Sequence, residues 1–178
     1  MPKGFLDPQI ILKKLKLKSD LTAVDFGSGA GGWAIPLAEQ LEDGKVVAID
    51  ILEEPLSALK AEMKRRNLKN IKIVKSDIES QDGSEMESES CDLVLMTNLL
   101  FQTEDKEAVL KEAKRILKKR GRILIVDWLP NLSFGPQKGV EAKNIKRLAE
   151  KLSLKIKKEF EASSHHWAMI LEKKSLSE

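Results

Sequence analysis

VDFGSGAGG, residues 24–32, is the stretch that decides the fold of this 178-residue chain. The apolar run 21–26 predicts a short buried strand, and the glycines after it let the backbone turn tightly. Apolar side chains then recur at Trp33, Leu37 and Leu41, which is the spacing of a helix with one buried face. Because a helix start exposes free N–H groups, the stretch predicts a strand, a ligand-binding turn and a helix.

The glycine motif alone fits two classes of ligand. Gly27, Gly29 and Gly32 match the dinucleotide fingerprint G-x-G-x-x-G. With Asp25 and Gly31, the same loop also matches [DE]-x-G-x-G-x-G. A carboxylate at Asp25 repels a pyrophosphate but attracts an ammonium group by charge and hydrogen bonding. The loop therefore favours a ligand with an amino-acid part, and a nicotinamide dinucleotide is the alternative.

Two further acids follow the next two predicted strands. Asp50 comes about 20 residues after the glycines, where a carboxylate can accept hydrogen bonds from both ribose hydroxyls. Asp77 is placed to accept a hydrogen bond from an adenine amino group, with Ile51 and Ile78 packed on the ring. For both acids the alternative is a local role, as a helix cap or a turn cap without any ligand.

Strand-like and helix-like segments alternate along the chain. Apolar runs predict strands over residues 21–26, 46–49, 71–74, 92–96 and 122–126. Helical spacing and capping residues predict helices over about 7–17, 31–41, 53–67, 103–119 and 141–152, with Thr103 as a cap and Gly121 as a stop. Alternation at this spacing is typical of parallel strands joined by right-handed crossovers, so we expect a doubly wound α/β fold.

The end of the chain departs from that alternation. Two predicted strands, over 154–160 and 166–172, are separated only by residues 161–165. This connection is too short for a helical crossover, so the two strands must pair antiparallel. We therefore expect a mostly parallel sheet with one antiparallel hairpin at its edge.

Composition and charge exclude several classes of protein. The content of 42% hydrophobic and 33% charged residues is typical of a globular chain, and no apolar run approaches the roughly 20 residues of a membrane span. A net charge of +3, spread along the chain, does not indicate nucleic-acid binding. The first residues lack the apolar stretch of a secretory signal and Cys91 is the single cysteine, so we expect one cytoplasmic domain over residues 1–178.

With these pieces in order, the chain resembles the class I S-adenosylmethionine-dependent methyltransferases, especially the type 11-like ubiquinone/menaquinone biosynthesis branch. The likeness is carried by VDFGSGAGG, VVAIDI, KSDIES, DLVLMTNLLFQTEDKEAVLKEAKRILKKRGRILIVDW and HHWAMILEK. It implies a Rossmann-like seven-stranded sheet of order 3-2-1-4-5-7-6 with strand 7 antiparallel. It also implies S-adenosyl-L-methionine as the cofactor and methyl transfer to an unidentified small-molecule acceptor.

The resemblance also assigns residues to the cofactor. By position, Asp25 and the glycines contact the methionine part, Asp50 the ribose and Asp77 the adenine, while Thr97 lies near the transferred methyl group. The full predicted set is Asp25, Gly27, Ser28, Gly29, Gly31, Asp50, Ile51, Asp77, Ile78 and Thr97. Two departures leave the acceptor open: only about 20 residues precede the first strand, and an Asn-Pro-Pro-Tyr motif and Tyr are absent.

A general base is needed only if the acceptor must lose a proton. We predict His165, His166 and Asp127 as catalytic candidates, with Asn98 and Trp128 as further residues of an acceptor pocket. On alternating strand positions only one of the two histidines is expected to face the cleft, and a structural role is the alternative for each. Adjacent histidines without a nearby Cys or acid do not predict a metal site.

Two other functions remain open at this point. A nicotinamide-dependent oxidoreductase fits the glycine loop, but such enzymes usually add a second domain or a catalytic Tyr and Lys pair, and the chain has no Tyr. A non-catalytic binding module with the same fold is the other alternative. Neither a nucleic-acid partner nor a membrane is expected, and the sequence leaves the oligomeric state open.

Overall fold

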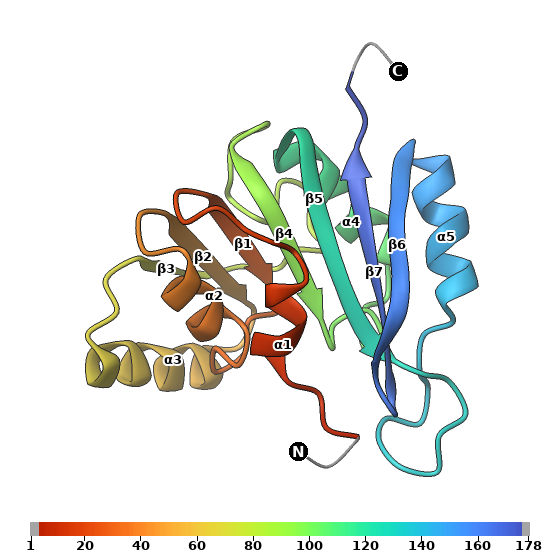
Figure 1. The fold of residues 1–178 in the computed structure, drawn as a ribbon, viewed down its shortest axis with the longest axis horizontal. Helices are drawn as coiled ribbons and strands as arrows, with labels where there is room; N and C mark the ends of the chain where they lie inside the picture. The colour runs from red at the N-terminus through yellow and green to blue at the C-terminus, as the bar shows by residue number, and fades with distance from the viewer. Residues whose placement is uncertain (1–3, 176–178) are drawn as a thin grey trace.

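A mixed β-sheet forms the centre of the computed structural model, which describes residues 4–175 (Figure 1). Within these residues the sheet has seven strands in the order β3-β2-β1-β4-β5-β7-β6. The strands are β1 (Thr22–Phe26), β2 (Lys45–Asp50), β3 (Ile71–Lys75), β4 (Cys91–Thr97), β5 (Leu117–Trp128), β6 (Leu154–Ser163) and β7 (His166–Lys173). Strand β7 pairs antiparallel with both β5 and β6, whereas the other pairs are parallel. The predicted fold class, strand order and edge hairpin are confirmed.

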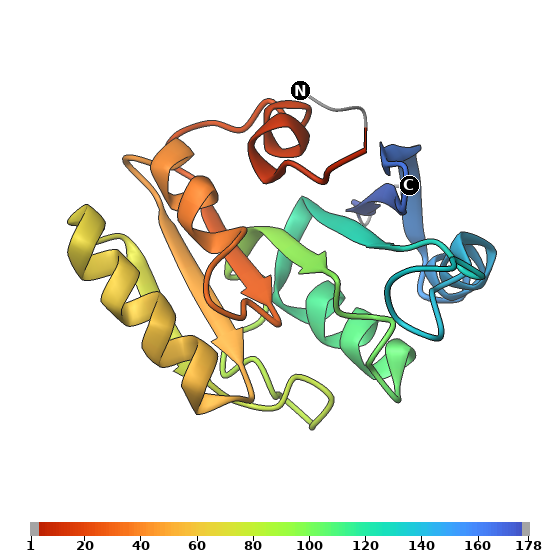
Figure 2. The same ribbon diagram turned by 90° about the horizontal axis from the view of Figure 1, so that it is seen from below.

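Helices cover both faces of this sheet. The helices are α1 (Pro8–Lys13), α2 (Ala34–Gln40), α3 (Glu53–Arg66), α4 (Lys106–Ile116) and α5 (Ala142–Lys151). Figure 2 shows α1 and α2 on one side of the sheet and α4 on the other. No helix in the described part of the chain is long and apolar enough to cross a membrane.

The residues of β1 show why both faces need a cover. Val24 and Phe26 pack with Leu110 of α4 in one hydrophobic cluster, whereas Ala23 packs with Leu37 of α2 in a second. Neighbouring strand residues point to opposite faces, so a strand with buried side chains on both faces can lie only between two layers. Each fully buried aliphatic or aromatic side chain stabilises the fold by about 1.5–3 kcal/mol relative to exposure.

The first helix is shorter than the sequence predicts. Asp7 caps α1 by accepting hydrogen bonds from the backbone N–H of Gln9 and Ile10, as expected for its position before a proline. The helix ends at Lys13, about one turn before the predicted end. The chain leaves the helical conformation because Lys16 has a left-handed backbone, with φ of 48°.

The boundaries of α4 also differ from the prediction. Asp105, not Thr103, caps the helix by accepting a hydrogen bond of 2.9 Å from the Ala108 N–H. The helix ends at Ile116, and β5 begins at the next residue because Leu117 is fully buried and pairs with β4. The helix was predicted to run to about Lys119 with Gly121 as its stop; the left-handed residue there is Arg120 (φ of 62°), inside a register shift of the β4–β5 pair.

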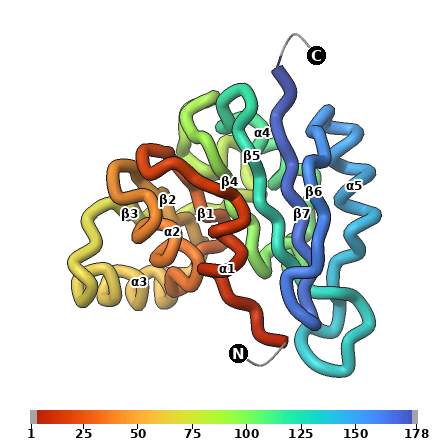
Figure 3. Tube along the Cα trace, in the orientation of Figure 1, coloured from red at the N-terminus to blue at the C-terminus, as the bar shows by residue number. Residues whose placement is uncertain are grey.

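Three segments that are far apart in the sequence meet at one end of the sheet. The trace in Figure 3 shows the chain before α1, the loop after β5 and the β6–β7 turn gathered there. The loop after β5 is closed by two backbone hydrogen bonds, from Val140 N–H to Trp128 O and from Leu129 N–H to His165 O, each 2.9 Å. This end of the molecule therefore combines residues that no local sequence motif connects.

Candidate functional site

The ends of strands β1, β2 and β3 border a cavity of about 380 Å³. We call it the glycine-loop cavity, and its lining includes the predicted residues Gly27, Gly29, Asp50, Ile51, Asp77 and Ile78. The carboxyl ends of parallel strands are where open α/β sheets bind small ligands. The other predicted cofactor residues, Asp25, Ser28, Gly31 and Thr97, are buried next to these loops.

Asp25 is a buried carboxylate without a partner. Its side chain is 0% exposed, and neither oxygen has a hydrogen-bond partner among residues 4–175. Burial raises the pKa of this carboxyl group from 3.8 to about 8; the negative charge of Asp50 adds to the rise, and the nearby backbone N–H of Ala34 opposes it. A buried charge is costly unless it is paired, so this arrangement is typical of a site that a cationic ligand completes.

Three glycines of the loop have left-handed backbones, but they serve different purposes. The φ angles of Gly27, Gly29 and Gly31 are 69°, 52° and 88°. A Cβ atom at Gly31 would overlap Leu59 Cδ1 in the core, so this buried side chain would have to shift to make room for it. A Cβ at Gly29 would meet no described atom within 4 Å, so the absence of a side chain there leaves open space beside the cavity.

Asp50 connects the end of β2 to the glycine loop. Its Oδ2 accepts a hydrogen bond of 2.8 Å from the Gly29 N–H, and its Oδ1 accepts one of 3.0 Å from the Leu52 N–H. The contact to Leu52 is the kind of local role considered as the alternative for Asp50, whereas the contact to Gly29 was not predicted. A carboxylate has about four acceptor positions, so two remain for the hydroxyl groups of a ligand.

Asp77 combines the two roles that were considered for it. Its Oδ1 accepts a hydrogen bond of 2.9 Å from the Glu79 N–H, which is a local turn contact, and the residue also lines the cavity. Ile78 is buried, whereas Ile51 is 57% exposed. An apolar surface at Ile51 and Ile78 therefore accompanies the carboxylate at this end of the cavity.

A second cavity, of about 590 Å³, lies on the other side of the same loops. We call it the aromatic cavity, and its lining includes Trp33, Asn98, Trp128, Phe134, His165 and His166. Gly32 and Asn98 border this cavity while Gly29 and Leu99 border the first, so the two cavities share the glycine loop and the segment after β4.

Contacts around Trp128 shape the aromatic cavity. The Trp128 and Phe134 rings meet edge to face with centroids 5.9 Å apart. Gly135 has φ of 101°, and a Cβ there would lie 2.7 Å from the Trp128 ring, so the loop after β5 passes directly over this ring. Sequence reasoning missed Phe134 and Trp33 as site residues, and an aromatic residue isolated in a loop was the only available signal for Phe134.

Both histidines line the aromatic cavity, so the expectation that only one would face the cleft is wrong. His165 lies in the turn before β7, where strand alternation does not apply. Its Nδ1 lies 2.8 Å from Ser164 Oγ, and its ring meets the Phe134 ring edge to face.

His166 is the more buried histidine, with 6% of its surface exposed. Its Nδ1 lies 2.9 Å from Ser163 Oγ, and its ring centroid is 4.1 Å from that of Trp128. Its Nε2 is buried and has no hydrogen-bond partner within the described chain. Burial, together with the nearby His165, lowers the pKa of His166 from 6.5 to about 4, so the ring is neutral at pH 7.

Asn98 follows β4 and presents a second buried atom without a partner. Its backbone is left-handed, with φ of 51°, and its N–H donates to Val126 O over 2.8 Å. Its Oδ1 makes no hydrogen bond to any residue that the structure describes. Asn98 Oδ1 and His166 Nε2 are therefore two unsatisfied polar atoms on side chains that line one cavity.

Asp127, the third predicted catalytic residue, is fully buried and holds backbone in place. Its Oδ2 accepts from the Leu100 N–H and its Oδ1 from the Trp128 N–H, both over 2.8 Å. Burial raises the pKa of its carboxyl group from 3.8 to about 6, and these backbone N–H groups limit the rise. These contacts position the segment after β4 and Trp128. Within residues 4–175, no group of three His, Cys, Asp or Glu side chains is arranged to hold a metal ion.

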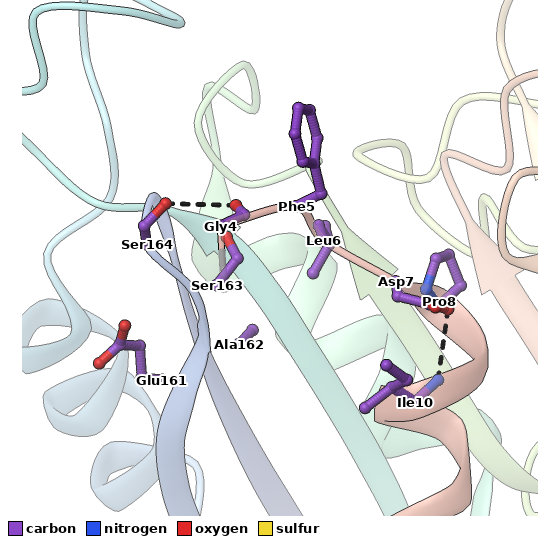
Figure 4. Close-up of a pocket in the computed structure, with 10 residues that line it drawn as sticks. All are labelled: Gly4, Phe5, Leu6, Asp7, Pro8, Ile10, Glu161, Ala162, Ser163 and Ser164. Atoms are coloured by element: carbon purple, nitrogen blue, oxygen red, sulfur yellow. Dashed lines mark hydrogen bonds between the residues drawn. The ribbon is translucent and has the colours of Figure 1, made fainter. Parts of the chain in front are cut away.

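A groove of about 700 Å³ adjoins the aromatic cavity and shares Gly4, Phe5, Leu6, Pro8 and Ser164 with it. Figure 4 shows the N-terminal segment running beside the β6–β7 turn, joined to it by a hydrogen bond of 3.2 Å from Ser164 Oγ to Gly4 O. The Phe5 side chain points away from this groove and is 84% exposed (Figure 4). The N-terminal segment thus borders both this groove and the aromatic cavity.

Residues 17–177 match the family model described as a methyltransferase domain, so the chain belongs to this family. A demethylmenaquinone methyltransferase from Lactococcus lactis is 33% identical over 119 residues, which cover 65% of this chain and 46% of that protein. Ribosomal RNA small subunit methyltransferase G from Mesoplasma florum is 25% identical over 154 residues, covering 86% of this chain and 59% of that protein. The chain thus spans about half the length of the curated relatives it matches.

The fold of this chain also resembles that of a solved methyltransferase structure. The crystal structure of a SAM dependent methyltransferase from Aquifex aeolicus superposes with a TM-score of 0.85 at 24% identity, covering 94% of this chain and 90% of that one. The family match thus confirms the predicted resemblance to the methyltransferases, and the superposition confirms the predicted fold.

Proposed function

We propose that this chain binds S-adenosylmethionine in the glycine-loop cavity and transfers its methyl group to a small molecule in the aromatic cavity. The observation that carries the proposal is Asp25, a fully buried carboxylate without a partner beside a loop that leaves open space at Gly29. The ammonium group of the methionine part supplies the missing positive charge, which a dinucleotide pyrophosphate does not.

The remaining residues of the predicted set fit the other parts of this cofactor. Asp50 retains acceptor positions for the ribose hydroxyls, and Asp77 lines the cavity near the apolar side chains of Ile51 and Ile78. We assign Ser28 and Gly31 to the loop around the methionine part and Thr97 to the surroundings of the methyl group. When bound, this cofactor supplies an electrophilic methyl group, and the chain contributes alignment and exclusion of water.

The aromatic cavity holds the acceptor in this proposal. His166 is the favoured base because its Nε2 is buried, neutral and without a partner in the described chain. We keep His165 as the second candidate, since it lines the same cavity. Asp127 contributes by positioning Trp128 through its backbone N–H.

We prefer a small-molecule acceptor to RNA because of the charge of the residues that line the aromatic cavity. The two relatives named above act, by their names, on demethylmenaquinone and on ribosomal RNA. Binding of RNA depends on Lys and Arg contacts to phosphates, and neither residue type occurs in the lining of the aromatic cavity within the described chain. We further propose that residues 1–178 act as one domain in the cytoplasm, where the single buried Cys91 stays reduced.

Thermal unfolding and calorimetry with S-adenosylmethionine, S-adenosylhomocysteine and NAD test this proposal. A ligand at 100 times its Kd adds roughly 2.7 kcal/mol of stability, which raises the Tm of a chain of this size by about 5–10 °C. We expect this effect from both sulfur nucleosides and not from NAD. Stabilisation by NAD alone would support the oxidoreductase alternative instead. Cofactor binding without transfer to any acceptor would support a binding module.

A further inference from the structure

The described lining of the aromatic cavity contains no Asp, Glu, Lys or Arg, although these residues make up 33% of the chain. Its histidine next to Trp128, His166, is neutral at pH 7. A charged acceptor would lose its hydration in this cavity without finding an opposite charge, which is unfavourable by several kcal/mol. The cavity therefore selects an uncharged molecule.

Aromatic rings form much of the remaining wall. Trp128 contacts both Phe134 and His166, with centroid distances of 5.9 and 4.1 Å, and Trp33 lines the same cavity. Aromatic side chains favour stacked or edge-to-face contacts with another ring. A volume of about 590 Å³ is sufficient for a molecule of one or two fused rings with its substituents.

Two buried polar atoms without hydrogen-bond partners among the described residues belong to side chains that line this cavity. Buried polar groups are nearly always hydrogen-bonded, so Asn98 Oδ1 and His166 Nε2 each lack a partner that a ligand can supply. Oδ1 is an acceptor. In the tautomer that carries the proton on Nδ1 and donates it to Ser163 Oγ, His166 presents a second acceptor at Nε2, and the proposal takes this tautomer. Two acceptors call for a donor on the ligand.

We propose that the acceptor is an uncharged, flat aromatic molecule whose hydroxyl or ring N–H donates to Asn98 Oδ1 or His166 Nε2, and that this protic atom receives the methyl group. The inference deepens the proposed function and rests on it. The acceptor's oxygen or nitrogen forms a bond to the methyl carbon while the sulfur–methyl bond breaks, and that electron pair stays on the sulfur. The proton passes from the acceptor to His166 Nε2 and then to solvent.

Three related probes test the substrate class with the protein saturated with S-adenosylhomocysteine. These probes are 2-naphthol, 2-methoxynaphthalene, which lacks the donor, and 6-hydroxy-2-naphthoate, which carries a charge. Binding is followed by the fluorescence of Trp33 and Trp128, which line the cavity. We expect 2-naphthol to bind roughly tenfold more tightly than either analogue. Equal or tighter binding of an analogue, or no binding of any probe, overturns the inference.

Two variants separate the polar contacts from packing. Asn98→Gly removes the side chain without strain at a left-handed position, and His166→Ala removes the proposed proton acceptor. We expect at least one of them to remove most of the preference for 2-naphthol over 2-methoxynaphthalene, while the Kd of the methoxy compound changes no more than about threefold, the effect of lost packing. Asn144→Ala, on the exposed side of α5, is the matched control and should keep the full preference.

The same titrations distinguish a failure of the proposed function from a failure of this inference alone. Each variant must bind S-adenosylhomocysteine with the wild-type Kd, which shows that it is folded. If wild-type protein does not bind this nucleoside, the proposed function fails and the inference fails with it. If the nucleoside binds but both variants keep the preference for 2-naphthol, only the inference is overturned. Transfer of a radioactive methyl group from S-adenosylmethionine to 2-naphthol, lost in His166→Ala, would add direct support.

Discussion

The glycine-loop cavity and the aromatic cavity share two loops but differ in charge. Asp50 and Asp77 line the first and Asp25 is buried beside it, whereas the described lining of the second contains no Asp, Glu, Lys or Arg. The surroundings of the first cavity are thus acidic, whereas the described lining of the second is uncharged, rich in aromatic rings and carries two unsatisfied polar atoms. Neutralising a single carboxylate should therefore have very different effects, depending on whether a cation faces it.

Asp25→Asn is the strongest test of the charged side. The variant keeps the shape of the side chain but leaves the ligand's ammonium group without its counter-charge, which costs about 3–5 kcal/mol when the pair is buried. We expect the affinity for S-adenosylmethionine, measured by calorimetry at pH 8, to fall more than about 100-fold. The free variant should also unfold at a higher temperature than the wild type at pH 8, because it no longer buries an unpaired charge.

Asp20→Asn is the matched control for that variant, because Asp20 is exposed and lies before β1. It should retain wild-type affinity and stability. An unchanged affinity in Asp25→Asn would instead show that the cofactor's cation lies elsewhere, and the contrast between the two cavities would lose its physical basis.

The pH dependence of binding gives the next largest effect. The pKa of Asp25 in the free folded protein is about 8, raised from 3.8 mainly by burial, so most molecules carry a proton there at pH 7. Binding of an ammonium group requires the ionised form, so it should release about 0.9 protons at pH 7. The affinity should rise roughly 50-fold between pH 6 and pH 8. Calorimetry in buffers of different ionisation enthalpy measures the proton release, which should vanish in Asp25→Asn.

As the pH rises, the stability of the free protein should fall, whereas its affinity for the cofactor should rise. A carboxyl group whose pKa is higher in the folded state stabilises the fold below the unfolded value, about pH 4, and this contribution is lost as the pH rises through 8. The Tm of the wild type relative to Asp25→Asn should therefore fall from pH 4 to pH 8. The shifted pKa values of Asp127 and His166 are common to both proteins and cancel in this difference. If the difference in Tm between the wild type and Asp25→Asn did not change with pH, the raised pKa of Asp25 would be contradicted.

Two glycine variants divide the loop into a ligand side and a core side. Gly29→Ala places a methyl group in open space, so we expect a roughly tenfold loss of cofactor affinity and a stability loss of about 1–2 kcal/mol from its left-handed backbone. Gly31→Ala adds overlap with Leu59 to the same strain, so its stability loss should reach about 2–5 kcal/mol. Urea unfolding and calorimetry measure both quantities. A larger stability loss in Gly29→Ala would reverse this assignment.

The sequence predicted which residues gather around the glycine-loop cavity because its information there is local. Asp25 and the glycines are contiguous, and Asp50 and Asp77 follow short apolar runs that are typical of strands. The carboxyl ends of parallel strands meet at one edge, so strand order brings these acids together without further detail. The strand order and the antiparallel edge followed from the family resemblance and from the short 161–165 connection.

The aromatic cavity was less predictable because distant segments build it. Phe5 precedes α1, Trp33 follows the glycine loop and Phe134 lies in the loop after β5, and no shared period relates these residues. The histidine pair was recognised, but the alternation argument failed because His165 lies in the turn and not in β7. Asp127 illustrates a further limit, since only the folded structure reveals that both its oxygens accept backbone N–H groups.

Asp77→Asn should give the smallest effect, and for that reason it sharpens the contrast with Asp25. The amide keeps an oxygen that can accept from the Glu79 N–H, so the turn after β3 should persist. A neutral adenine amino group requires an acceptor and no charge, and a neutral hydrogen bond is weaker than a charged one by about 1 kcal/mol. We therefore expect only a twofold to fivefold loss of affinity, roughly what that difference allows. A loss as large as that in Asp25→Asn would mean that the cation faces Asp77, with the cofactor lying in the opposite direction along the cavity.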